Sequence, residues 1–233
     1  MILSCMCSKG GPGKSTITTN LAVHWTVEEE YDVLILDADP QHSVYKWGLA
    51  RQNNDVNHIE VKPIDFENIH TPEQFIDYVE AQREHYDIIL IDVPGRDDEL
   101  FRWPMLACDF ALLVVDPGGF NAFSYEDDSE TLTRAQIWRQ ELGIEPFMAG
   151  IVFNRVDSDY DTVARAHKAA IEENDYPWPL MEQYIHKLQT AKRAAGHGYG
   201  VSEVSGGEKG AEQFKMLSRQ IADMLFGGDD DDE

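Results

Sequence analysis

The sequence predicts a doubly wound α/β fold, in which a mostly parallel sheet is flanked by helices on both faces. Short apolar runs alternate with longer amphipathic stretches along all 233 residues. Most of these runs are continuously apolar, which is typical of parallel strands buried on both faces. No Pro/Ser-rich linker and no internal repeat divides the chain. We therefore expect one domain, residues 1–226.

Five apolar runs are the predicted strands: Ile2–Cys7, Asp32–Leu36, Ile88–Ile91, Phe110–Val115 and Phe147–Phe153. Seven amphipathic segments are the predicted helices: Lys14–Glu29, His42–Gln52, Thr71–His85, Asp98–Ala107, Tyr125–Leu142, Tyr160–Asn174 and Glu208–Phe226. In the first helix, Ile17, Leu21 and Trp25 form one stripe, which we expect to pack against the sheet. A fold of this kind binds its ligands at the carboxyl ends of the strands.

The acidic balance of the chain restricts what it can bind. A net charge of −24 argues against a general affinity for nucleic acids or anionic membranes, so any such contact must be local. The longest apolar run, Phe110–Val115, is too short to cross a bilayer. The start of the chain does not read as a secretion signal, and three cysteines suit a reducing compartment. We expect a cytoplasmic protein whose acidic tail, residues 227–233, is disordered.

A glycine-rich segment, SKGGPGKST at residues 8–16, separates the first strand from the first helix. Gly10, Gly11 and Gly13 allow the backbone N–H groups to wrap a phosphate, and the helix N-terminus adds partial positive charge. Lys14 is expected to reach the β- and γ-phosphates and Ser15 to ligate Mg²⁺. A strict GxxxxGK[ST] loop would have Gly at position 8, where this chain has Ser.

Two further strands end in acids. Asp37 and Asp39 follow the second strand in the sequence LDADPQ, and Asp92 ends the strand IILID. Because the carboxyl ends of parallel strands meet at one edge of the sheet, these acids can face the phosphate site and hold magnesium or orient a water. Asp92 is placed as a Walker B carboxylate.

These three motifs resemble the deviant Walker A, Walker A′ and Walker B motifs of the ParA/MinD-type ATPases, and the resemblance covers most of the chain. It implies a P-loop NTPase fold and an Mg²⁺-dependent ATPase that forms an ATP-sandwich dimer and segregates plasmid or chromosomal DNA. It also implies that Lys9 reaches the phosphates of the partner subunit, that Asp39 positions the hydrolytic water with Asp37 beside the metal, and that Asn154 contacts adenine.

Taken together, the motifs and the resemblance predict three sets of site residues. The catalytic set is Lys9, Lys14 and Asp39. The nucleotide-binding set is Lys9, Gly10, Gly11, Gly13, Lys14, Ser15, Thr16 and Asn154. The metal-binding set is Ser15, Asp37 and Asp92, and the expected cofactors are ATP and Mg²⁺.

Basic residues are concentrated near the carboxyl end of the chain. Between positions 187 and 219 six basic residues face three acids, whereas the chain as a whole is strongly acidic. The six are Lys187, Lys192, Arg193, Lys209, Lys215 and Arg219. In the family, basic residues of this region bind DNA nonspecifically, which requires only phosphate contacts. A solvated helix face is the alternative explanation of this charge.

The phosphate loop begins at residue 8, so the chain resembles the short partition ATPases. These rely on a separate centromere-binding protein of the ParB type to recognise specific DNA sequences. Five acids follow the last predicted helix and would repel an anionic membrane, so no membrane partner is expected.

Three alternative functions stay open. A GTPase is possible because residues 92–95 fit DxxG and Asn154 to Asp157 approximates NKxD, although Arg155 departs from that pattern. A metabolic enzyme of the same fold could use ATP to activate a small acid, but such relatives generally lack the lysine that Lys9 matches. A cargo-positioning ATPase of the same family is the third.

Overall fold

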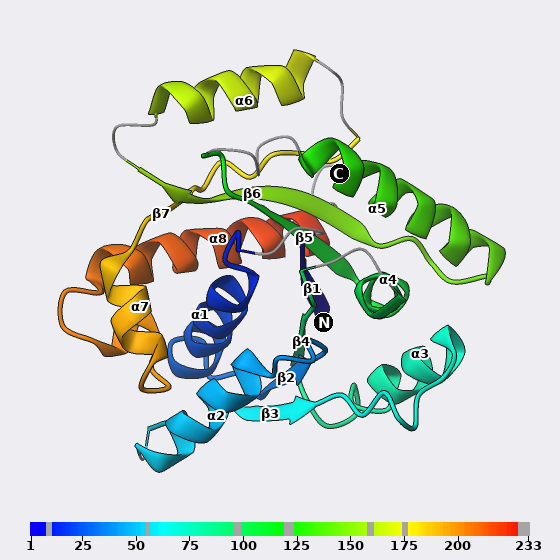
Figure 1. Ribbon diagram of the computed structural model, residues 1–233, viewed down its shortest axis with the longest axis horizontal. Coiled ribbons are helices and arrows are strands. Elements are labelled where there is room, and N and C mark those ends of the chain that lie inside the picture. Colours follow the sequence, from blue (N-terminus) through cyan, green and yellow to red (C-terminus); the bar gives the residue numbers. More distant parts are fainter. Residues whose placement is uncertain are drawn as a thin grey trace, which may run out of the picture.

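The computed structural model describes residues 1–7, 11–54, 56–95, 99–118, 124–157, 161–173 and 177–227. Seven strands form one sheet in the order β3-β2-β4-β1-β5-β6-β7, and every neighbouring pair is parallel (Figure 1). The strands are β1 Ile2–Met6, β2 Val33–Asp37, β3 Glu60–Pro63, β4 Ile88–Asp92, β5 Phe110–Val115, β6 Met148–Val156 and β7 Ile185–His186. The predicted doubly wound α/β class is confirmed.

Helices cover both faces of the sheet (Figure 1). They are α1 Lys14–Val27, α2 Ser43–Asn53, α3 Pro72–Glu80, α4 Glu99–Ala107, α5 Ser124–Glu141, α6 Asp161–Glu173, α7 Gln189–Ala195, η3 Val201–Glu203 and α8 Glu208–Phe226. One layer contains α1, α2, α7 and α8, and the opposite layer contains α3, α4 and α5. Among the described residues, no helix combines the length and the apolar character needed to cross a membrane.

The central strand β1 is buried along its whole length, as a continuously apolar run predicts. Successive side chains of a strand point to opposite faces, so Leu3 and Cys5 pack with α1 and α8, whereas Ile2 and Met6 pack with the layer of α3, α4 and α5. Burial of an aliphatic side chain contributes about 1.5–3 kcal/mol. The two apolar cores therefore hold the sheet in place and fix the edge where the strands end.

The structure differs from the sequence prediction at weakly patterned elements. It adds β3, β7, α7 and η3, which were not predicted, and it ends α3 at Glu80, five residues before the predicted end. Residues 81–85 form turns, in which the N–H groups of Gln82 and Arg83 bond to carbonyl groups three residues earlier. β2 includes Asp37, so that this acid belongs to the strand instead of following it.

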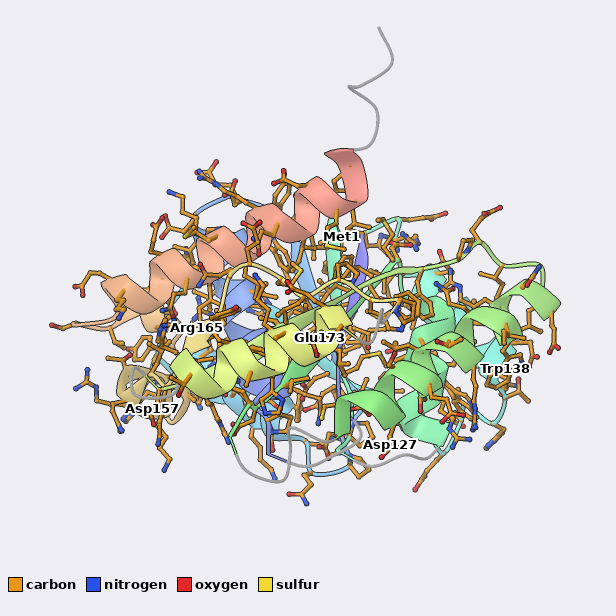
Figure 2. All side chains as sticks on the ribbon, turned by 90° about the horizontal axis from the view of Figure 1, so that it is seen from above. Met1, Asp127, Trp138, Asp157, Arg165 and Glu173 are labelled. Carbon is orange, nitrogen blue, oxygen red and sulfur yellow. The ribbon has the colours of Figure 1, made fainter. Side chains whose placement is uncertain are left out.

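The parallel strands bring the predicted motifs to one edge of the sheet. Figure 2 shows Asp157, just beyond β6, and Asp127, near the start of α5, on the side of the molecule away from Met1, which precedes β1. Open α/β sheets bind ligands at this carboxyl edge.

Candidate nucleotide and metal site

The phosphate loop leads from β1 into α1. Residues 8–10 lie outside the described residues, so the predicted roles of Lys9 and Gly10 stay predictions. Gly11 and Gly13 have φ values of 98° and 100°, and Gly13 is the N-cap of α1. These left-handed conformations explain the glycines at the two positions, because most other residues adopt them only with strain. The first turn of α1 thus presents its N–H groups at the carboxyl edge of the sheet.

Asn154 lies against this loop from the end of β6. Its Nδ2 donates to the carbonyl oxygen of Pro12 at 2.6 Å, and its Oδ1 accepts from the N–H of Arg155 at 2.9 Å. A Cβ atom on Gly13 would lie 2.2 Å from Asn154 Nδ2. The side chain of Asn154, which was predicted to contact adenine, is therefore buried and hydrogen-bonded to the phosphate loop. A glycine is required at position 13 to allow this close approach.

Lys14 and Thr16 stand at the beginning of α1. The Lys14 side chain is buried, and its Nζ donates to the carbonyl oxygen of Cys7 at 3.2 Å. Since Cys7 directly precedes the loop, this bond holds the ammonium group beneath the phosphate-binding turn. Thr16 lines two cavities, one toward β7 and one toward α2.

Asp92 is the centre of a hydrogen-bonded cluster under the first turn of α1. Its Oδ2 accepts from Ser15 Oγ at 2.8 Å, and its Oδ1 accepts from Thr18 Oγ1 at 3.2 Å. Thr18 was not among the predicted site residues. Its spacing of three residues from Ser15 was the available signal, because residues three apart share a helix face.

Asp37 stands beside Asp92 in the parallel ladder of β2 and β4. Its carboxylate accepts from the N–H of Asp39 at 3.1 Å and from the N–H of Tyr45, in the first turn of α2, at 2.8 Å. Asp39 lies in the loop between β2 and α2, where its Oδ1 accepts from the N–H of Gln41 at 2.9 Å. The structure therefore brings Ser15, Asp37 and Asp92 together. It places Asp39 two residues after Asp37, in the loop between β2 and α2.

The pKa of Asp92 is raised to about 7, mainly by burial and also by the neighbouring Asp37, although the bonds from Ser15 and Thr18 and the charge of Lys14 act to lower it. Burial likewise raises the pKa of Asp37, against the backbone bonds from Tyr45 and Asp39. Two buried acids side by side repel each other when both are ionised. A divalent cation between them would favour the ionised forms.

The oxygen donors at this point fit Mg²⁺, which prefers carboxylate, hydroxyl and water oxygens. Ser15, Asp37 and Asp92 would hold the ion. The described residues contain no group of three or more His, Cys, Asp and Glu side chains suited to a metal. A magnesium ion here would thus complete its coordination with water and with the phosphate oxygens of a nucleotide, as it does in phosphoryl-transfer sites.

A cavity of about 590 Å³ opens between the carboxyl ends of β5, β6 and β7 and the helix α7. Its volume lies within the range of about 300–1,000 Å³ that small-molecule sites occupy. Thr16 and Asn154 form its wall on the side of the phosphate loop, and Asp157 and Lys192 also line it. This arrangement provides room for the base and ribose of a nucleotide whose phosphates lie on the loop.

The cavity wall carries two ion pairs that the sequence did not reveal. Arg155 has a left-handed backbone with φ of 61°, and its Nη1 lies 3.8 Å from Asp116 Oδ2. Lys187 Nζ lies 3.5 Å from Asp157 Oδ2. The acid that a guanine-reading motif would use is therefore paired with a lysine on the cavity wall.

The six residues predicted to contact DNA lie in different surroundings, at the cavity, on α7 and along α8. Lys187 and Lys192 line the cavity, and Arg193 donates to the carbonyl oxygen of Ser205 at 2.9 Å. Lys209 is exposed at the start of α8. Further along α8, Lys215 and Arg219 lie close enough to His24 to affect its titration. Lys215 also shares a surface hollow with the acids Glu28, Glu208 and Glu212.

Comparison with known proteins gives one family. Residues 4–201 match the CobQ/CobB/MinD/ParA nucleotide binding domain. A search of curated protein sequences finds no significant match.

Solved structures of similar fold cover nearly the whole chain. A Cyanothece McdA variant in complex with ATP has a TM-score of 0.74 at 16% identity and covers 95% of this chain and 96% of its own. The septum site-determining protein MinD of Pyrococcus horikoshii, complexed with Mg-ADP, has a TM-score of 0.67 at 21% identity and covers 97% of both chains. The ParA protein of pNOB8, bound to nonspecific DNA, has a TM-score of 0.66 at 14% identity and covers 95% and 98%.

At these identities the solved structures establish the fold. The family domain spans most of the chain and contains the phosphate loop together with all three acids. The chain therefore belongs to the CobQ/CobB/MinD/ParA nucleotide-binding domain family.

Proposed function

We propose that this protein is an Mg²⁺-dependent ATPase switch that closes into a homodimer around ATP and opens after hydrolysis to ADP and phosphate. The observation that carries the proposal is the cluster of Ser15, Thr18 and Asp92 beside Asp37, placed under the phosphate loop at the carboxyl edge of the sheet. It joins a hydroxyl that suits a metal, two buried acids and a helix N-terminus at one point. P-loop NTPases hold Mg²⁺ with a Ser or Thr hydroxyl of the loop and an Asp at the end of a neighbouring strand, beside the phosphate-binding backbone.

The proposed roles follow the geometry. Lys14 is held under the loop, where its ammonium group would bind the β- and γ-phosphates. Ser15, Asp37 and Asp92 would hold Mg²⁺, which when bound supplies charge neutralisation at the phosphates. Asp39, in the loop that follows Asp37, would orient the attacking water. Lys9 would reach the phosphates of the partner subunit and thus couple ATP to dimerisation.

The proposed biological role is the segregation of plasmid or chromosomal DNA. A ParA structure of similar fold is bound to nonspecific DNA, and another, from Borrelia burgdorferi, is described as a plasmid partition protein bound to AMPPNP. We propose that the ATP dimer binds DNA nonspecifically in the cytoplasm, on the nucleoid, and that a ParB-like protein stimulates hydrolysis. Positioning of a protein cargo by the same switch is the alternative within the family.

The decisive experiment measures phosphate release from ATP and from GTP, with and without Mg²⁺ and with and without nonspecific duplex DNA. We expect slow Mg²⁺-dependent ATP turnover that DNA or a protein partner stimulates, and none in Lys14→Ala. Turnover that requires a small carboxylic acid would support a metabolic enzyme instead. No Mg²⁺-dependent turnover of either nucleotide under any of these conditions would contradict the proposal.

Dimerisation is tested separately by size-exclusion chromatography with and without ATP. Lys9→Ala is expected to bind ATP but to stay monomeric, because it lacks the cation for the partner's phosphates. Asp39→Ala is expected to remain dimeric, because it binds ATP without hydrolysing it. A Lys9→Ala protein that dimerises like the wild type would rule out the proposed role of this lysine.

GTP hydrolysis is the second candidate, and one observation favours it. Asp157 lies on the wall of the cavity, where a carboxylate could accept the N–H groups of guanine. Its pairing with Lys187 favours ATP, because the carboxylate that would read guanine is already engaged. The ratio of ATP to GTP turnover, measured in the wild type and in Asp157→Ala, distinguishes the two.

A further inference from the structure

His42 stands at the N-cap of α2 with an unusual backbone. Its φ and ψ angles are 51° and 43°, in the left-handed region, and its side chain makes no capping hydrogen bond. Among the described residues, only Glu30, His42 and Arg155 adopt positive φ without being glycine. A left-handed backbone costs free energy for any residue with a Cβ atom, although His tolerates it better than most. The surrounding structure must therefore hold this conformation in place.

Two backbone hydrogen bonds meet at His42. Its N–H donates to the carbonyl oxygen of Asp39 at 2.8 Å and closes a turn over residues 39–42. Its carbonyl oxygen accepts from the N–H of Lys46 at 3.0 Å and begins the helical ladder of α2. The left-handed residue is thus the point at which the chain passes from the turn that contains Asp39 into the helix.

Asp37 and Asp39 accept hydrogen bonds from residues close to His42 in the chain. Asp37 accepts from the N–H of Asp39, which precedes His42, and from the N–H of Tyr45, which follows it. Asp39 itself accepts from the N–H of Gln41 within the turn. A change in the dihedral angles of His42 would move the N–H of Tyr45 relative to the N–H of Asp39, so Asp37 would lose one of its two partners.

The imidazole does not account for the conformation. Its Nδ1 is buried without a hydrogen-bond partner, and its ring contacts Tyr45 edge-on with 6.4 Å between the ring centres. No bond from Nδ1 therefore offsets the backbone strain. The side chain borders a cavity of about 530 Å³ lined by residues that follow β2 and by the end of β3 with the residues after it.

We propose that His42 is a positioning residue for hydrolysis, whose left-handed backbone sets the place of Asp39 relative to Asp37. The inference rests on the proposed function, in which Asp39 orients the attacking water and Asp37 lies at the metal. It assigns the effect to the backbone conformation and not to the imidazole. Glycine, or asparagine, which both accept the left-handed region, should therefore replace His42 without loss.

The test compares His42→Gly, His42→Asn, His42→Ala and His42→Val for kcat and KM in ATP hydrolysis. Gly and Asn are expected to keep kcat within about twofold of the wild type, because both tolerate the conformation. Val, which is β-branched, is expected to lower kcat by about fivefold to thirtyfold, with Ala between, if the full strain acts on Asp39. At saturating Mg²⁺, KM should change little, because the phosphate loop and its Lys14 do not involve this turn.

Glu30 provides the matched control. It has φ of 60°, nearly the same as His42, but it lies between α1 and β2 at the opposite edge of the sheet. Glu30→Val should therefore lower the free energy of unfolding as His42→Val does and leave kcat unchanged. This comparison separates positioning from general destabilisation.

Three results would overturn the inference: His42→Gly losing as much kcat as His42→Val, His42→Val keeping full kcat, or Glu30→Val losing kcat equally. Wild-type protein without turnover would instead refute the proposed function. In that case the Mg²⁺ concentration that half-saturates ATP binding gives the second measurement, because Tyr45 holds Asp37 through the same turn. A half-saturating Mg²⁺ concentration that is lowest in His42→Gly and His42→Asn, higher in His42→Ala and highest in His42→Val would support the role of His42. Equal concentrations in all four variants would overturn it.

Discussion

Hydroxyl groups from two successive turns of α1 hold the carboxylate of Asp92. Ser15 and Thr18 each donate to a different oxygen of this buried acid. Ser15 is a predicted metal ligand, whereas Thr18 shares its single hydroxyl hydrogen between Asp92 and the carbonyl oxygen of Lys14, within its own helix. Their contributions to metal binding should therefore differ, although both contact the same carboxylate.

Asp92→Asn is expected to raise the Mg²⁺ concentration that half-saturates ATP binding by tenfold or more, which corresponds to about 1.4 kcal/mol or more. The reason is the loss of one negative charge next to the ion while the shape and the acceptor oxygen remain. Isothermal titration of ATP at a series of Mg²⁺ concentrations measures it. Thr18→Val is the control, because it removes one bond to Asp92 and no predicted metal ligand. Equal Mg²⁺ requirements in the wild type and Asp92→Asn would exclude Asp92 from the metal site.

His24, in the last turn of α1, titrates in a buried position. Burial lowers its pKa, Glu29 at 3.5 Å and Glu28 act to raise it, and Lys215 and Arg219 act to lower it. The unfolded chain, with a His pKa of about 6.5, takes up the proton at a higher pH than the folded chain does. The free energy of unfolding is therefore retained above about pH 6.5 and falls as the pH drops through the lowered value.

In His24→Gln, the free energy of unfolding should decrease less between pH 7.5 and pH 5 than it does in the wild type. Urea denaturation at the two pH values measures the difference for the wild type and the variant. His85→Gln is the control, because His85 is exposed. His167, whose pKa burial also lowers, should leave part of the pH dependence in His24→Gln. A variant with the full wild-type pH dependence would show that His24 does not contribute.

At the scale of elements, one buried arginine joins α2 to the segment that follows α7. Arg51 in α2 donates Nη1 and Nη2 to the two carboxylate oxygens of Glu203 at 2.7 and 2.8 Å, and Nη1 also donates to the carbonyl oxygen of Gly198 at 3.1 Å. Glu203 also accepts from the N–H of Gly200. The helix that follows the loop containing Asp39 is therefore anchored to the segment that follows α7.

Glu203→Gln should lower the free energy of unfolding by about 3–5 kcal/mol, because it leaves the guanidinium of Arg51 buried without its counterion. Glu172→Gln is the matched control, since it breaks an exposed pair with Lys168 on α6. Such exposed pairs contribute about 0–1 kcal/mol. Chemical denaturation measures both variants. Similar losses of unfolding free energy in Glu203→Gln and Glu172→Gln would mean that the buried ion pair contributes no more to stability than the exposed one.

Gly198 shows the same anchoring through its backbone. Its φ is 73°, and a Cβ atom would lie 2.2 Å from the backbone nitrogen of Arg51. Gly143 has a similar φ of 70°, with no atom within 4 Å of the position of a Cβ. Gly143→Ala should therefore lose only the cost of the left-handed backbone, about 1–2 kcal/mol. Gly198→Ala should lose clearly more, and equal unfolding midpoints in denaturant would contradict the close contact.

The sequence predicted those elements whose own pattern is strong. β1, β4 and β5 are continuous apolar runs and were predicted within a residue or two. β3, with the sequence EVKP, and the two-residue β7 carry no such pattern, because edge strands need not be apolar on both faces. α7 has no side-chain cap, and only Ala194 is buried within it. Contacts between distant parts of the chain specify these elements, and a local pattern cannot reveal them.

The site was predictable to the extent that it lies in local motifs. Lys14, Ser15, Asp37 and Asp92 meet as expected, because the order of the strands follows from the fold class. The brace from Asn154 to Pro12 depends on β6 and β1 lying on either side of β5, so it joins residues 142 positions apart. The one-domain division at residue 226 and the functional roles of all the predicted site residues stay predictions.

For the whole molecule, the distribution of charge decides whether nonspecific DNA binding is physically reasonable. The chain carries a net charge of −24, which repels phosphates at long range. The predicted contacts are basic residues on α7, on α8 and after β7. Lys192 and Lys209 are exposed, whereas Lys187 is paired with Asp157 and Lys215 lies among acids. Of the four predicted lysines, Lys192 and Lys209 are therefore the best placed to contact DNA.

Lys192→Gln combined with Lys209→Gln should weaken binding to nonspecific duplex DNA in the presence of ATP and Mg²⁺. Each lost phosphate contact should make the slope of log K against log salt concentration less steep by about 0.9. Fluorescence anisotropy at several salt concentrations measures the slope. Arg134→Gln, on the exposed face of α5 in the opposite helix layer, is the control for net charge. If Arg134→Gln, which loses one charge, reduced the slope half as much as the double variant, which loses two, the effect would come from total charge, and these two lysines would not form the DNA contact.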